Sequence, residues 1–199
     1  MDVTLVVILA IAYLVGNISP GWLLVRLRRG GDVRQQGSGG TGATNTARAL
    51  GRWWFYVVLA LDILKAACAV NLPWLAFDGR APLTYFLACG IAVITGHIWP
   101  VLLGLRGGKG VGPFLGVWLG MGSLCWLYPF TLLGPILAGL FFLPLRKGAF
   151  MCALCGLMGQ PLCFWLVSKN ALAAALAAVI VLLIQFAHRS NFKNAFCQK

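Results

Sequence analysis

The residues whose types are best suited to binding or chemistry lie in a glycine-rich segment, residues 37–48. Apolar runs flank this segment on both sides. Glycines allow backbone N–H groups to crowd around a phosphate, hydroxyl and amide side chains add donors, and an arginine can bind two phosphate oxygens at once. This chemistry favours a phosphate site over a flexible surface loop. The residues expected to form it are Gly37, Ser38, Gly39, Gly42, Thr44, Asn45 and Arg48.

A second glycine-rich segment, residues 107–110, precedes another apolar run. It is not an ordinary nucleotide P-loop, because Leu103 stands where the first glycine is required and Gly110 stands where Ser or Thr should follow the lysine. A lysine among glycines at the start of a helix is still suited to binding an anion. The residues expected to bind it are Gly107, Gly108 and Lys109.

The third polar segment begins the C-terminal tail and contains His188 and Asn191. His188 could act as a general base, or it could lie at the membrane interface beside Arg189. Taken alone, the residue favours neither interpretation. Its possible role therefore depends on whether the tail reaches the two glycine-rich segments.

Two charged side chains occur inside an apolar run, where charges are costly and need partners. Asp62 and Lys65 lie three residues apart, and so on one face of a helix. A structural ion pair between them is favoured slightly over a catalytic role. His97, near the end of the following run, is more typical of an interfacial hydrogen-bonding residue than of a catalyst.

Several chemistries are excluded by what the sequence lacks. It has only four acidic residues, so a carboxylate cluster that could hold a metal ion is not expected. The H-x-x-x-x-D motif of coenzyme-A-dependent glycerolipid acyltransferases is missing, because Leu102 and Lys193 stand five positions after the two histidines. We therefore expect a site that works without a metal or a cofactor.

The composition places these segments on a membrane protein. Of the 199 residues, 60% are hydrophobic, against roughly 45–50% in soluble domains, and 10% are charged, against about 25%. A soluble surface needs more polar cover, and a disordered chain would be poorer in apolar residues. The net charge of +12 then indicates anionic lipid headgroups rather than nucleic acid as a partner. We expect one all-α integral membrane domain, residues 1–199.

The apolar runs predict about seven transmembrane helices, since each span needs about 20 residues. The run 111–145 is divided at Pro129, which removes a backbone donor and disfavours helix at the preceding residue. With the N-terminus outside and the C-terminus in the cytoplasm, 13 of the 16 Lys and Arg fall on the inner side, as do all three polar segments. The expected spans are residues 3–25, 53–77, 82–103, 111–128, 129–145, 149–167 and 171–187.

These motifs, in their order and spacing, resemble the PlsY family of bacterial acyl-phosphate:glycerol-3-phosphate acyltransferases over nearly the whole chain. The likeness includes residues 16–21, 62–65 and 96–97, whereas the family usually has Asn where Gly40 stands and an acidic residue where Ser190 stands. The resemblance implies a multi-pass protein of the bacterial inner membrane with its site facing the cytoplasm. The residues it implies in catalysis are His188, Lys109 and Ser38, with Asn191 among those that bind substrate.

The reaction implied by the resemblance transfers a fatty acyl group from acyl phosphate to the 1-hydroxyl of glycerol 3-phosphate, giving lysophosphatidic acid and phosphate. An acyl phosphate is a mixed anhydride with a good leaving group, so it requires neither an enzyme nucleophile nor a metal. A cationic pocket must bring the two phosphates together. The base would be His188 or the substrate's own phosphate. A small transporter or binding protein for an organic phosphate, and an inactive paralogue, are the alternatives.

Overall fold

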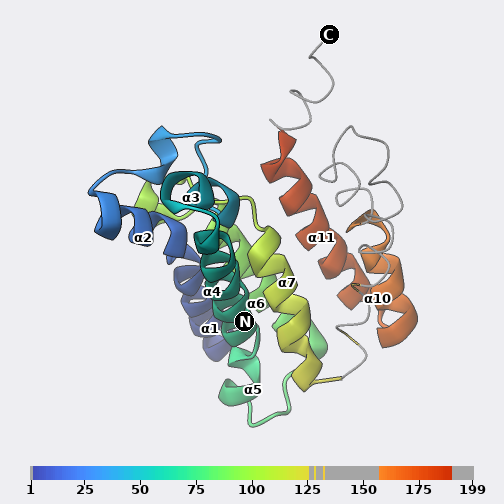
Figure 1. Ribbon diagram of the computed structural model, residues 1–199. Helices are drawn as coiled ribbons and strands as arrows, with labels where there is room; N and C mark the ends of the chain where they lie inside the picture. The colour runs from blue at the N-terminus through green and yellow to red at the C-terminus, as the bar shows by residue number, and fades with distance from the viewer. Residues whose placement is uncertain (1, 126–127, 129–131, 133–156, 190–199) are drawn as a thin grey trace. The chain divides into compact units, whose positions relative to one another are not determined.

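The computed structural model describes residues 2–125, 128, 132 and 157–189. By its internal contacts the chain divides into two compact units, Met1–Gly120 and Met121–Lys199. Within the described ranges every regular element is a helix, and strands are absent from them (Figure 1). The all-α class predicted from the sequence is therefore confirmed for this part of the chain.

The first predicted span is broken into two helices, α1 (Val3–Asn17) and α2 (Pro20–Arg29). Pro20 starts α2, and the residue before a proline is disfavoured in a helix. Ser19 is accordingly extended and caps α2, with its Oγ accepting a hydrogen bond from the backbone N–H of Trp22 at 3.5 Å. The predicted span 3–25 therefore lies in a stretch that is long and apolar enough to cross a bilayer, but it consists of two helices rather than one. The break leaves backbone carbonyls near Ile18 that need donors.

The polar stretch after α2 contains a short helix that the sequence pattern did not predict. A 3-10 turn, η1 (Val33–Gln35), leads into the glycine-rich loop, and α3 (Ala43–Leu50) follows. Gly42 and Gly51 flank helix α3 as its N-cap and C-cap, and the helix buries Asn45, Thr46 and Ala49. About half of the segment expected to be a phosphate-binding loop, residues 43–48, is therefore helical.

The next two predicted spans also end in shorter pieces. Helix α4 (Trp53–Val70) is followed by α5 (Leu72–Ala76), and Asn71 closes the break by donating from Nδ2 to the carbonyls of Ala67 (2.9 Å) and Gly120 (3.0 Å). Helix α6 (Leu83–Ile98) ends ahead of Pro100, and a 3-10 turn, η2 (Val101–Leu103), continues it. The prolines explain where the helices stop.

Glycines bring two pairs of helices into backbone contact within the first unit. Helix α7 (Val111–Gly120) packs on α4 through glycines spaced four residues apart, and a Cβ built on Gly116 would overlap the carbonyl oxygen of Ile63. Helix α1 packs on α6 in the same way, and a Cβ on Gly16 would overlap the carbonyl oxygen of Val93. Small residues at such spacing are typical of helix packing in membranes.

In the second unit, η3 (Met121–Ser123) is followed, after a stretch outside the described residues, by α10 (Gln160–Ser168) and α11 (Ala171–Ala187). Helix α11 matches the predicted span 171–187. Asn170 caps it, with Oδ1 accepting from the N–H of Ala173 at 3.0 Å. The predicted span 129–145 lies almost entirely outside the described residues, as does the first part of 149–167.

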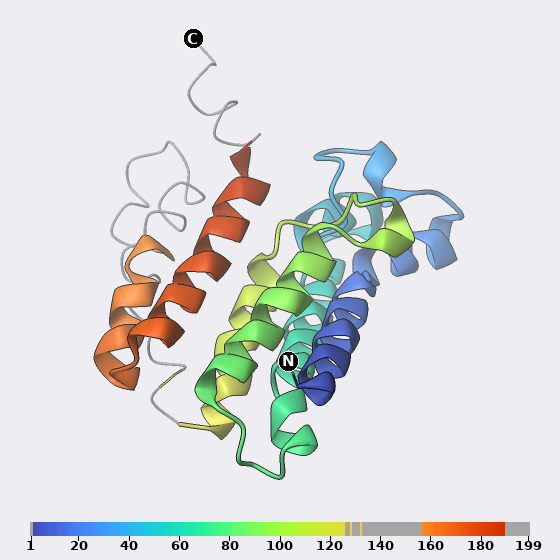
Figure 2. The ribbon, with the colours of Figure 1, turned by 180° about the vertical axis from the view of Figure 1, so that it is seen from behind.

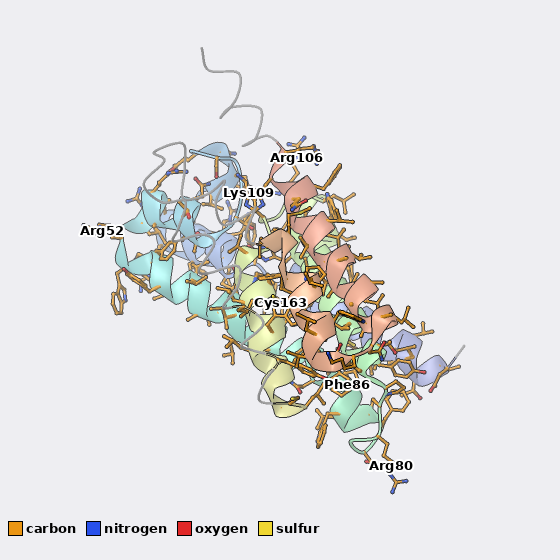
Figure 3. All side chains as sticks on the ribbon, turned by 90° about the vertical axis from the view of Figure 1, so that its right-hand side faces the viewer. Arg52, Arg80, Phe86, Arg106, Lys109 and Cys163 are labelled. Atoms are coloured by element: carbon orange, nitrogen blue, oxygen red, sulfur yellow. The ribbon has the colours of Figure 1, made fainter. Side chains whose placement is uncertain are left out.

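Three helical stretches in the described residues are long and apolar enough to cross a bilayer, namely Val3–Arg29, Trp53–Ala76 and Leu83–Leu103. The stretches Val111–Ser123 and Ala171–Ala187 are apolar but shorter. In the first unit, α2, α3 and the chain after α6 lie at one end of the helices, whereas α5 lies at the other (Figure 2). Lys109 and Arg106 are at the first of these ends and Arg80 is at the second (Figure 3).

Candidate active site

The glycine-rich loop is held from within by one buried side chain, that of Asn45, which is 3% exposed. Its Oδ1 accepts a hydrogen bond from the backbone N–H of Ser38 at 3.2 Å. Its Nδ2 donates to three carbonyl oxygens, those of Val33 (2.8 Å), Gln36 (3.0 Å) and Gly40 (2.8 Å). The amide is thus occupied in shaping the loop, a role that the sequence reasoning, which expected a phosphate ligand, did not foresee.

The other predicted residues of this loop lie at its surface. Ser38, Thr44 and Arg48 are exposed, and Gly39 and Gly42 lie between them along the loop. Gly37 has φ of 56°, in the left-handed region that favours glycine. A Cβ built on Gly37 would lie 3.5 Å from Nη1 of Arg48, so the guanidinium is next to the loop backbone. The loop therefore exposes the Ser38 hydroxyl, backbone groups and the Arg48 guanidinium on one stretch of its surface.

The two glycine-rich segments, more than 60 residues apart in the sequence, touch each other. The backbone N–H of Thr41 donates to the carbonyl oxygen of Gly107 at 3.3 Å. A Cβ on Gly40 would lie 3.7 Å from the same carbonyl oxygen and 3.9 Å from Oγ of Ser38. The expectation that these segments share one end of the molecule is met for this pair.

A second link, which the sequence reasoning missed, joins the stretches of chain that immediately precede the two segments. Arg34 forms an ion pair with Asp32 (Nη2 to Oδ2, 2.6 Å) and donates from Nη1 to the carbonyl oxygens of Leu103 and Arg106. Hydrogen bonding from Arg34 lowers the pKa of Asp32 to about 2, so the pair stays charged over the physiological range. An open cavity of about 460 Å³ lies along this link. The spacing of Asp32 and Arg34, two residues apart, was the only sign of this link in the sequence.

Two cations, Arg48 and Lys109, belong to the joined segments. Burial lowers the pKa of Lys109, and the positive charge of Arg48 lowers it further. That effect requires the two charges to lie close enough to repel. A bound anion between them would relieve the repulsion and favour the charged lysine. Arg48 and Lys109 therefore bring two positive charges to the joined segments of the first unit.

Beneath the second segment lies a buried charged cluster of Asp62, Lys65 and His97. Lys65 Nζ is 2.7 Å from Oδ1 of Asp62, so the ion pair expected from their spacing is present. His97 joins the pair with its Nδ1 3.0 Å from Lys65 Nζ and 3.4 Å from Asp62 Oδ1. The sequence reasoning treated His97 as interfacial, but it is only 4% exposed. The sequence did hold a sign of this position, because charged side chains inside a membrane, such as Asp62 and Lys65, need polar partners.

The third predicted segment belongs to the second unit. His188 is buried at the end of α11, where its Nδ1 lies 2.8 Å from the carbonyl oxygen of Ile184. Asn191 lies outside the described residues. Whether His188 and Asn191 join the site stays a prediction. Among the described residues, His, Cys and Asp side chains do not gather in threes as metal ligands would.

The sequence as a whole matches a known protein family. A family model described as glycerol-3-phosphate acyltransferase matches residues 6–198. The chain belongs to the glycerol-3-phosphate acyltransferase family. The match spans both units and nearly the whole sequence, so the family assignment does not rest on one motif.

Named members of the glycerol-3-phosphate acyltransferase family align with most of the chain. The glycerol-3-phosphate acyltransferase 1 of Desulfitobacterium hafniense (strain Y51) is 40% identical over 185 residues, covering 92% of this chain and 86% of the relative. The glycerol-3-phosphate acyltransferase of Synechococcus sp. (strain CC9902) is 36% identical over 187 residues, covering 94% and 89%.

Two crystal structures of PlsY, an integral membrane glycerol 3-phosphate acyltransferase, have the same fold. The glycerol 3-phosphate form matches with a TM-score of 0.80 and 30% identity, over 95% of this chain and 90% of that chain. The lysophosphatidic acid form matches with a TM-score of 0.78 and 28% identity over the same shares. The resemblance to the PlsY family is confirmed, and with it the assignment to an integral membrane protein.

Proposed function

We propose that the protein transfers a fatty acyl group from acyl phosphate to the 1-hydroxyl of glycerol 3-phosphate, forming lysophosphatidic acid and inorganic phosphate. Family membership supports the acceptor and the product, because the related PlsY structures hold glycerol 3-phosphate and lysophosphatidic acid. The observation that carries the proposal on this chain is the hydrogen bond from Thr41 to Gly107, which joins the segment that contains Arg48 to the segment that contains Lys109. Such a site suits a reaction between two phosphate-bearing substrates.

The chemistry asks little of the protein beyond placing and neutralising charge. The 1-hydroxyl oxygen attacks the acyl carbon, the bond from that carbon to the phosphate oxygen breaks, and phosphate leaves. The hydroxyl proton passes to a phosphate oxygen, either directly or through His188. Two dianions repel each other strongly in a partly dehydrated pocket, so cations and N–H donors that hold both lower the barrier. We assign this work to Arg48, Lys109 and the loop around Ser38.

We further infer one domain over residues 1–199, with seven spans, the N-terminus outside and the site facing the cytoplasm of a bacterial inner membrane. The family match across residues 6–198 supports a single domain. The concentration of Lys and Arg in the segments assigned to the inner side supports the orientation. In this topology His188 and Asn191 are on the cytoplasmic side of the membrane, as the two glycine-rich segments are.

This topology predicts which positions a reagent can reach from outside the cell. In a cysteine-free background, Arg80→Cys should react with a membrane-impermeant maleimide in intact cells. Gly31→Cys and Asn191→Cys should react only after the membrane is permeabilised, because both follow inner ends of spans. Labelling of position 191 in intact cells would contradict a shared cytoplasmic site.

The acyl donor is tested with purified protein and two activated forms of one fatty acid. With glycerol 3-phosphate present, palmitoyl phosphate should give equal amounts of lysophosphatidic acid and free phosphate, whereas palmitoyl-CoA should give no product. The reason is that the site holds phosphates and the H-x-x-x-x-D motif is missing from the sequence. Steady turnover of palmitoyl-CoA by a preparation free of other acyltransferases would refute the donor assignment. Failure with both donors would favour a binding protein or an inactive paralogue.

A further inference from the structure

The buried cluster of Asp62, Lys65 and His97 takes no part in the reaction described above, and it is costly to bury. The side chains of all three are less than 10% exposed, and they lie within the apolar stretches of α4 and α6. An ion pair deep in an apolar interior does not repay its desolvation unless its geometry is well satisfied. Its surroundings show what it holds in place.

On one side, the cluster fastens the broken first span. Lys65 Nζ donates to the carbonyl oxygen of Ile18 at 2.7 Å and to that of Gly16 at 3.4 Å, which are carbonyls near the end of α1. An ammonium is a donor only, so its contact with His97 at 3.0 Å uses the lone pair of Nδ1. The imidazole is thereby fixed in position by the lysine.

On the other side, the ring of His97 supports the second glycine-rich segment. The N–H of Gly108 donates to the carbonyl oxygen of His97 at 3.0 Å, and the N–H of Gly107 donates to that of Ile98 at 3.1 Å. A Cβ built on Gly108 would overlap Nε2 of the His97 ring. The backbone one residue before Lys109 therefore rests directly on this imidazole, with room for a glycine alone.

We propose that His97 is a positioning residue, which the Lys65–Asp62 pair holds in place and which sets the direction of Lys109 toward the side of the site where Arg48 lies. The inference rests on the proposed function, in which Lys109 binds a substrate phosphate. The cluster links the break after α1, the middle of α4 and the end of α6 to that one backbone segment. Displacing a charged ligand-binding group by about 1 Å can cost a hundredfold in rate.

The test compares Gly108→Ala, His97→Ala and the double variant, each as the full-length purified protein. Gly108→Ala should lose about a hundredfold in turnover, because its methyl group displaces the segment from the ring. His97→Ala should raise the KM of one phosphate substrate about tenfold or more and leave the other unchanged, as expected when one binding group moves. The double variant should be at least about tenfold more active than Gly108→Ala, because the methyl group occupies space the ring has left. Gly31→Ala, a glycine with open space around it, is the control.

Two results would overturn the inference. One is a double variant no more active than Gly108→Ala. The other is a His97→Ala variant that loses turnover with both KM values unchanged, which is the behaviour of a merely less stable protein. If the wild-type protein turns over no acyl donor, the proposed function fails, and thermal unfolding with glycerol 3-phosphate and with palmitoyl phosphate, each added alone, decides the inference separately. One of the two ligands should raise the unfolding midpoint of His97→Ala by less than it raises that of the wild type and of Gly31→Ala, because its affinity is lower. Equal shifts in all three proteins with both ligands would refute the role of His97.

Discussion

Replacing Lys109 or Arg48 with alanine is expected to lower the rate of phosphate release by about a hundredfold or more while the protein remains folded. Both side chains belong to the joined glycine-rich segments, and the positive charge of Arg48 helps to lower the pKa of Lys109. Under the proposed function, each of these cations binds a phosphate oxygen of a substrate. A lost direct phosphate contact should cost about 3 kcal/mol in such a pocket, and each 1.4 kcal/mol or so is tenfold in rate.

The matched control is Arg80→Ala, which removes an exposed positive charge from the opposite end of the first unit (Figure 3). It changes the net charge of the protein by the same amount, and it should leave turnover within about twofold of the wild type. Turnover is measured as phosphate released from palmitoyl phosphate in the presence of glycerol 3-phosphate. If Arg80→Ala is as damaging as Lys109→Ala in equally stable proteins, the assignment of Lys109 to a phosphate pocket loses its support.

Asn45→Ala should have an effect of similar size for a different reason. The substitution removes the amide that binds three carbonyls and one N–H of the loop, so the positions of Ser38 and Gly40 are no longer fixed. A misplacement of about 1 Å in such groups can cost a hundredfold in rate. Asn45→Asp should be no better, because a carboxylate accepts from Ser38 but cannot donate to the carbonyls.

Asn71→Ala is the matched control for this loop. Asn71 also donates its side-chain amide to two backbone carbonyls, but it does so at the junction of α4 and α5. Its loss should lower the thermal unfolding midpoint and leave turnover near normal below that temperature, since each lost hydrogen bond costs about 1 kcal/mol. Equal loss of turnover in both variants would mean that Asn45 contributes stability rather than the shape of a site.

The sequence predicted the helical class, the glycine-rich segments and the presence of cations beside them, because composition and spacing carry that information directly. It did not predict that the first span breaks before Pro20, although proline is a known cause. The long apolar run on both sides concealed the break. Helix α3 was also missed, since its residues match a polar loop in composition and only its burial of Asn45, Thr46 and Ala49 distinguishes it.

The roles of individual site residues were the least predictable part. A sequence gives the type of a side chain but not its direction, and the hydrogen bonds by which Asn45 supports the loop appear only in the structure. His97 could be assigned only when the structure placed it against Lys65 and Gly108, which are 32 and 11 residues away along the chain. Contacts of this kind depend on how helices cross. That information resides in the packing of glycines rather than in any local motif.

The backbone contacts of α4 with α7 and of α1 with α6 also restrict where a fatty chain can go. Even one methyl group at Gly116 or Gly16 would overlap a carbonyl oxygen, so neither crossing has space for a hydrocarbon tail. Opening one would move α4, which carries Lys65, away from α7, or α6, which carries His97, away from α1. A tail that binds to the first unit must therefore bind elsewhere than at these two crossings. Residues that select chain length are then expected away from Gly16 and Gly116, so that selectivity can change while these two helix contacts stay as they are.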